Sequence, residues 1–152
     1  MTKEFITYNQ ALALKELGFD EPCLAYYQKS AVIGDDTILP IQIRNKASNF
    51  NDNEYSKMGV PFCSAPTYSQ VFRWFREKYQ LFHHVGVDQT TEPKFYYTIA
   101  KFVGNPNDLT EKEWYWDGIE EGVYLYRTYE QAEKNCLEKL ISAPRLVRVN
   151  NY

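Results

Sequence analysis

Two adjacent histidines, His83 and His84, are the residues of this chain best suited to metal or proton-transfer chemistry. An imidazole can bind a metal ion and can exchange a proton near neutral pH. The flanking residues predict a strand, in which successive side chains point to opposite faces, so the two rings are not expected to share one ion. No Glu or Cys stands at a companion spacing. The pair therefore predicts a structural or surface role for both histidines and no metal site.

Three cysteines are the candidate nucleophiles. Cys136 lies on the apolar stripe of a predicted helix and Cys23 opens a predicted strand, so both are expected to be buried as small hydrophobes. Cys63 is expected in a loop just ahead of a helix, where its thiol pKa could be lowered. No His is placed beside it, so we expect no nucleophilic role. The odd number and wide spacing favour reduced cysteines in a cytosolic protein.

Sequence motifs of common enzymes do not occur in this chain. It has no phosphate-cradling glycine loop, no Gly-x-Ser-x-Gly turn and no His-Glu-x-x-His helix. We therefore expect a protein that is not an enzyme, with no catalytic residue and no cofactor.

A basic and aromatic group lies on one predicted helix, at Arg73, Trp74 and Arg76, followed by Lys78. With Arg145 and Arg148 it could form a modest nucleic-acid patch. A ring beside a guanidinium could equally hold a nucleotide or another small metabolite. The net charge of −3 favours a third interpretation, a solvated helix face, over the nucleic-acid patch.

The run Trp114-Tyr115-Trp116 stands among carboxylates in a segment bounded by Gly and Pro. Large aromatic side chains dominate the energetics of protein–protein contacts, so the run is a candidate contact surface. It could also belong to the sheet core, with alternation placing Trp114 and Trp116 inward and Tyr115 outward. Both interpretations stay open. Aromatic residues make up 16% of the chain.

The sequence Thr-Tyr-x-Gln occurs three times, beginning at Thr7, Thr67 and Thr128. Each copy matches a capping box, in which the Thr hydroxyl accepts from the N–H three residues later and the Gln side chain accepts from the Thr N–H. The pattern predicts helices from about 7 to 17, 67 to 82 and 128 to 143, the first ending at Gly18 and the last at Pro144. The even spacing raises the possibility of a duplicated unit, but convergence on a good cap is the favoured interpretation.

The apolar pattern of each helix also predicts which side chains are buried. For the last helix these are Tyr129, Ala132, Cys136, Leu137 and Leu140.

Between the helices the pattern predicts strands at about 23–28, 38–43, 82–87, 94–103 and 123–126. Residues 44–63 are polar and unpatterned and are expected to form a long loop. The fold class is therefore α+β, with three helices packed on a mainly antiparallel sheet in the order α-β-β-α-β-β-β-α. We expect one domain over residues 1–152, with a short C-terminal tail from about 144 to 152.

Three stretches, ALALKELGFDEPC from Ala11, APTYSQVFRWFREKY from Ala65 and TYEQAEKNCLEKLI from Thr128, resemble small uncharacterised proteins. Those proteins are encoded by Bacteroidetes genomes and their phages or prophages. The resemblance covers about a third of the chain and departs over residues 44–63. It implies a mobile-element context and a cytosolic location, and it carries over no activity and no functional residue.

The expected function is a non-enzymatic, phage-type accessory module that binds a host or phage protein. The candidate contact residues are Arg73, Trp74, Arg76, Trp114, Tyr115 and Trp116. The alternatives are a small-ligand binder for a nucleotide or metabolite and a weak nucleic-acid-associated protein. The N-terminus lacks a signal-peptide pattern and no stretch approaches the length of a membrane span, so we expect a cytoplasmic protein with no membrane partner.

Overall fold

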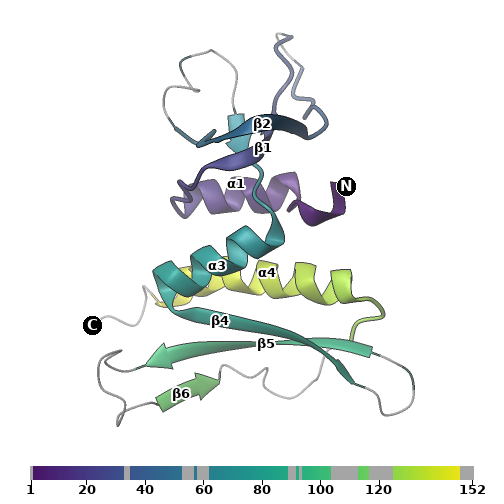
Figure 1. Ribbon diagram of the computed structural model, residues 1–152, viewed down its shortest axis with the longest axis vertical. Coiled ribbons are helices and arrows are strands. Elements are labelled where there is room, and N and C mark those ends of the chain that lie inside the picture. Colours follow the sequence, from purple (N-terminus) through teal and green to yellow (C-terminus); the bar gives the residue numbers. More distant parts are fainter. Residues whose placement is uncertain are drawn as a thin grey trace. The chain divides into compact units, whose positions relative to one another are not determined.

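The computed structural model describes residues 2–32, 35–52, 57, 62–88, 92, 94–103, 113–116 and 125–147. The chain divides into two compact units, residues 1–70 and 71–152, which Figure 1 shows as ribbons. This division is finer than the single domain expected from the sequence, and its boundary falls inside a helix. Each unit is described by itself.

The first unit holds a short 3₁₀ helix, η1 (Thr2–Glu4), a helix, α1 (Tyr8–Glu16), and the start of the boundary helix, α3 (Tyr68–Tyr79). Its strands are β1 (Cys23–Gln28), β2 (Gln42–Ser48) and β3 (Phe62–Ser64). They form an antiparallel sheet in the order β2-β1-β3. The Lys15 ammonium on α1 donates to the Phe62 carbonyl on β3 at 2.8 Å, which joins the helix to the sheet.

Helix α1 has the predicted signals at both ends. The Gln10 N–H donates to the Thr7 hydroxyl at 3.4 Å and the Thr7 N–H donates to the Gln10 side chain at 3.0 Å, which confirms the first capping box. At the other end Gly18 has φ 83°, a conformation that a residue without Cβ adopts at little cost. The Phe19 N–H donates to the Leu14 carbonyl, and both of these side chains are buried, as in a Schellman motif.

The expected loop over residues 44–63 is in part wrong. Strand β2 extends to Ser48, and β3 begins at Phe62; residues 53–56 and 58–61 lie outside the described part of the chain. Residues 42–47 of β2 are all exposed, and β2 is an edge strand with an irregular register against β1. A strand exposed on both faces has no apolar alternation, so the sequence pattern could not reveal it.

The strand expected at 38–43 begins later in the chain than predicted, because the exposed residues of β2 have no apolar alternation to mark its start. Ile38 forms only an isolated bridge with Lys29, and the regular strand starts at Gln42.

The turn after β2 is fixed by the side chain of Asn51. Its amide nitrogen donates to the Phe19 carbonyl at 2.9 Å, and its oxygen accepts from the Ser64 N–H at 2.9 Å. The neighbouring Phe50 is 3% exposed and packs on Tyr26, with 4.6 Å between ring centroids. Part of the predicted loop is therefore core.

The second unit contains most of α3, then β4 (Leu81–Asp88), β5 (Lys94–Val103), β6 (Glu113–Trp116) and α4 (Tyr129–Val147). The strands form an antiparallel sheet in the order β4-β5-β6 (Figure 1). Its core includes Val71, Phe72, Phe75, Ile99, Ala132, Cys136, Leu137 and Leu140.

One face of this sheet carries side chains that contact the helices. His83 stacks on Phe72 of α3, and Phe95 meets Tyr129 of α4. The alternate residues form the other face, where the Tyr96 ring lies over Gly86. A Cβ on Gly86 would stand 2.6 Å from that ring, so the glycine makes room for the tyrosine.

The second and third Thr-Tyr-x-Gln copies keep the threonine cap but redirect the glutamine. Gln70 and Gln131 donate their backbone N–H groups to Thr67 and Thr128 at 3.3 and 3.2 Å. The Gln70 amide donates to the Pro22 carbonyl, ahead of β1, at 2.9 Å. The Gln131 side chain accepts from the Arg127 N–H at 3.2 Å, one residue before the expected donor.

The predicted α+β class is confirmed, with the strands divided between two antiparallel sheets. The strand expected at 123–126 is not the third strand of the second sheet, because Tyr126 forms only a bridge with Phe95 and that place is taken by β6. Residues 123–124 lie outside the described part. The first strand after the helix is central in one sheet and at the edge in the other, which argues against duplication.

Helix α4 continues to Val147, past Pro144, where the tail was expected to begin. A proline removes one backbone donor, here the one that would reach Leu140, and near a helix end the remaining bonds suffice to continue for a few residues.

Gln80, the first residue after α3, has φ 55°. This left-handed conformation strains any residue with a Cβ, and glycine is the residue that most often follows a helix in this way. We predict that Gln80→Gly raises the free energy of unfolding by about 0.5–1 kcal/mol. Urea denaturation measures the change. Glu77→Gly, inside the same helix, is the control and should lower stability by about 1 kcal/mol. A loss of stability in Gln80→Gly would contradict the backbone strain inferred at this residue.

Candidate functional site

The two histidines lie on opposite faces of β4, as predicted. The His83 ring stacks on Phe72 with 3.6 Å between centroids and 12° between planes, whereas the exposed His84 meets Tyr96 edge-on. The pKa of His83 is lowered to about 4, mainly by burial and to a smaller extent by the charges of Arg76 and His84. Within the described residues, no three His, Cys, Asp or Glu side chains gather closely enough to hold a metal ion.

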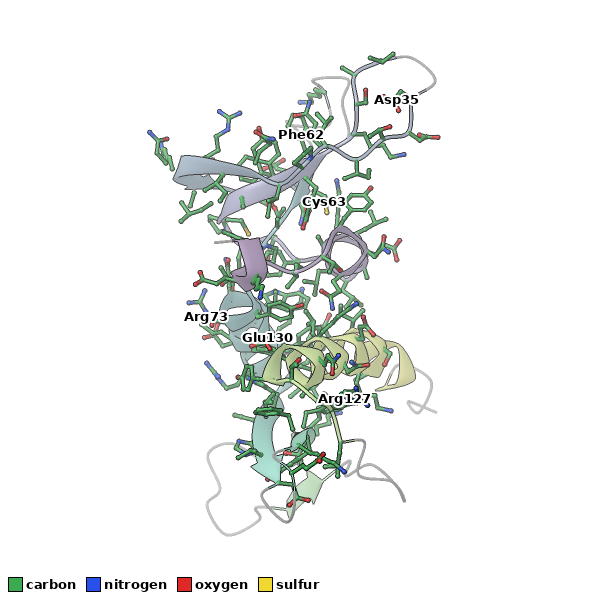
Figure 2. The ribbon with its side chains drawn as sticks, turned by 90° about the vertical axis from the view of Figure 1, so that its right-hand side faces the viewer. Asp35, Phe62, Cys63, Arg73, Arg127 and Glu130 are labelled. Atoms are coloured by element: carbon green, nitrogen blue, oxygen red, sulfur yellow. The ribbon has the colours of Figure 1, made fainter. Side chains whose placement is uncertain are left out.

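All three cysteines are buried free thiols. The prediction is confirmed for Cys23 and Cys136, and burial raises the pKa of each to about 12. The expected loop position and lowered pKa of Cys63 are wrong, because it lies in β3 (Figure 2), is 3% exposed and has its pKa raised by burial to about 11. The nearby Lys15 ammonium lowers this pKa but does not offset the burial. None of these thiols is therefore poised as a thiolate.

Helix α3 brings only part of its predicted binding group to the surface. Trp74 is 4% exposed, with edge-on contacts to Phe75 and Tyr79, so its ring is not an open stacking platform. The Lys78 ammonium lies 4.8 Å from the Trp74 ring centroid as a cation–π contact. Arg73 (labelled in Figure 2) and Arg76 are both exposed.

The backbone of the run Trp114-Tyr115-Trp116 forms most of strand β6. Trp116 pairs with Ala100, Tyr115 with Lys101 and Trp114 with Phe102. The side chains of the run lie outside the described part, as does that of Arg145, and Arg148 lies beyond it altogether. The structure therefore places the run at a sheet edge and leaves its contact role a prediction.

Apolar and aromatic side chains gather instead at one end of the second unit, around the start of α4. Val87 pairs with Phe95 across β4 and β5, and Phe95 bridges to Tyr126. The Tyr129 ring stands edge-on to Phe95 with 6.2 Å between centroids. Val87 is 40% exposed and Tyr129 46% exposed. We call this group, Val87, Phe95, Tyr126 and Tyr129, the Tyr129 patch.

The exposure of Tyr129 corrects a prediction, because the helix pattern placed it in the core with Ala132 and Cys136. Tyr129 is the first residue of α4, where no preceding helical turn covers its ring. The sequence signal that could have revealed this is its position directly after the Thr128 cap, since a first-turn residue extends past the packed part of a helix.

Two carboxylates stand beside the patch on α4. Glu133 lies one helical turn after Tyr129 and is half-buried, and Glu130 (labelled in Figure 2) is exposed. Burial raises the pKa of Glu133, and the charge of Glu130 raises it further. Burial also raises the pKa of Tyr129, with smaller contributions from Glu133 and Cys136. The negative charge therefore lies close to the exposed ring.

Comparison with known proteins identifies no relative: no protein-family model matches the chain, and no curated protein or solved structure is significantly similar to it. None of the helices in the described part of the chain combines the length and apolar character needed to span a lipid bilayer.

The lowered pKa of His83 predicts a stability that falls in acid. The pKa moves from an ordinary 6.5 to about 4 on folding, so the unfolded chain takes up the proton first as the pH falls. The contribution of His83 to stability is therefore complete above pH 6.5 and is lost progressively towards pH 4. We predict that His83→Phe, which keeps a ring on Phe72 without a charge, loses less thermal stability between about pH 7 and about pH 5 than the wild type. Equal losses of thermal stability in the variant and the wild type would contradict the role given to His83.

Proposed function

We propose that this chain is a non-enzymatic, cytoplasmic module that binds a protein partner through the Tyr129 patch. The exposure of Tyr129 beside Phe95 and Val87 is the observation that carries the proposal. Exposed aromatic rings seated on neighbouring apolar side chains are the residues that contribute most to protein–protein affinity. The phage-type resemblance would place the partner among host or phage proteins.

The backbone around the patch is ordered by hydrogen bonds, which favours binding without a large entropic cost. The Phe95 and Tyr126 backbones exchange two bonds, at 2.8 and 2.7 Å. The Thr128 hydroxyl begins α4 immediately before Tyr129. A surface held in this way loses little conformational freedom when a partner binds.

The small-ligand alternative has weaker support. It relied on aromatic rings with Arg73 or Arg76 for charge, and Trp74, the ring between these arginines in the sequence, is 4% exposed. The nucleic-acid alternative relied on the same arginines, in a chain whose net charge is −3. Neither is favoured by a specific contact among the described residues, so protein binding is the function that we put forward.

The test is capture by the immobilised full chain from a bacterial lysate, with Tyr129→Ser as the variant. Val32→Ser is the matched control, because it removes an apolar side chain that is 66% exposed and far in sequence from Tyr129. We expect a protein that the wild type and Val32→Ser retain equally and that Tyr129→Ser loses. Loss of a central ring typically costs about 2 kcal/mol, or about thirtyfold in Kd.

Circular dichroism of each variant confirms that α4 still forms. Recovery of the same proteins by all three chains would contradict the proposed surface, as would recovery of none.

A further inference from the structure

The carboxylates beside the Tyr129 patch bear on what the partner contains; this inference rests on the proposed function. Residues four apart on a helix lie on one face, so Glu133 stands next to Tyr129, and Glu130 is three residues from Glu133. The Glu130 carboxylate is close enough to raise the pKa of Glu133. The patch is therefore apolar at its centre and negative on its α4 side.

Neither carboxylate forms an ion pair with a described residue. The nearby Lys134 instead approaches Glu138, four residues later on α4, at 4.0 Å. Arg127 is exposed just ahead of α4. It donates its backbone N–H, and not its guanidinium, to the Gln131 side chain. Figure 2 labels Arg127 and Glu130 at separate positions around the helix start.

A structural role explains one of the two charges only. Glu130 lies in the first turn of α4, where a negative charge interacts favourably with the helix dipole. Glu133 is in the second turn, where that effect has faded, and it is half-buried next to a like charge. Such a carboxylate is destabilised in the isolated chain, and a cation brought by a partner would relieve it.

We propose that the Tyr129 patch binds a segment of a partner protein in which Lys or Arg residues alternate with apolar side chains. The apolar side chains would cover Phe95 and Tyr129, and the cations would lie against Glu133 and Glu130. Such complementarity selects the partner by charge, because an acidic segment would meet two carboxylates at close range. Screening by salt would weaken the contact.

The test uses two synthetic twelve-residue peptides with a fluorescent label, one of alternating Leu and Lys and one of alternating Leu and Glu. Fluorescence anisotropy measures their binding to the full chain. We expect the wild type to bind the Leu/Lys peptide at least about tenfold more tightly than the Leu/Glu peptide, with weaker binding at high salt. The double variant Glu130→Gln/Glu133→Gln should lose about tenfold in affinity for the Leu/Lys peptide.

Glu77→Gln, an exposed carboxylate on α3, is the matched control and should bind as the wild type does. Binding of the Leu/Lys peptide that the double variant leaves unchanged, or no binding to the wild type, overturns the charge inference.

Tyr129→Ser separates this inference from the proposed surface. Peptide binding that depends on Tyr129 but not on the two carboxylates would leave the surface standing and remove the charge preference. Peptide binding that Tyr129→Ser leaves unchanged would remove the surface itself.

Discussion

A threonine hydroxyl that accepts from the N–H three residues later is the interaction on which the described helices α1, α3 and α4 depend. The first N–H groups of a helix have no partner within the helix, so this bond fixes where the helix starts. The start in turn fixes the face that each later residue occupies. In α4 it places Ala132, Cys136 and Leu140 in the core and leaves Tyr129, the residue directly after the cap, outside it. The exposed ring and the carboxylate one turn later both follow from the position of Thr128.

The glutamine of the same motif shows how much the surroundings decide. Gln10 completes the reciprocal pair with Thr7, Gln70 holds the Pro22 carbonyl ahead of β1, and Gln131 receives the Arg127 N–H. A side-chain amide can donate and accept, so it bonds to whichever backbone group the fold brings near. The threonine bond lies within four consecutive residues in all three copies. The glutamine bond has a different partner in each copy, local for Gln10 and Gln131 and distant in the sequence for Gln70. For this reason the helix starts are predictable from sequence and the links between elements are not.

The same division explains which other expectations were met. Helices with an apolar stripe and strands with alternating side chains, such as Phe72 on α3 and Ile99 on β5, could be predicted because burial imposes the period. Strand β2 could not, because all of residues 42–47 are exposed and no period is imposed. Asn51 and Phe50 were assigned to a loop because only their contacts with Phe19, Ser64 and Tyr26 make them structural. Exposure at single positions was harder to predict: Trp74, a predicted contact residue, is buried, and Tyr129, predicted to lie in the core, is exposed.

The central claim is that a protein contact forms where α4 begins, on an apolar surface bordered by Glu130 and Glu133. The most direct measurement is amide chemical-shift mapping of the full chain, recorded by NMR with and without the Leu/Lys peptide. The account predicts shifts concentrated at Val87, Phe95 and Tyr126 and through the first two turns of α4. Shifts confined to the opposite face of the sheet, around His84 and Tyr96, or to the exposed strand β2, would contradict it.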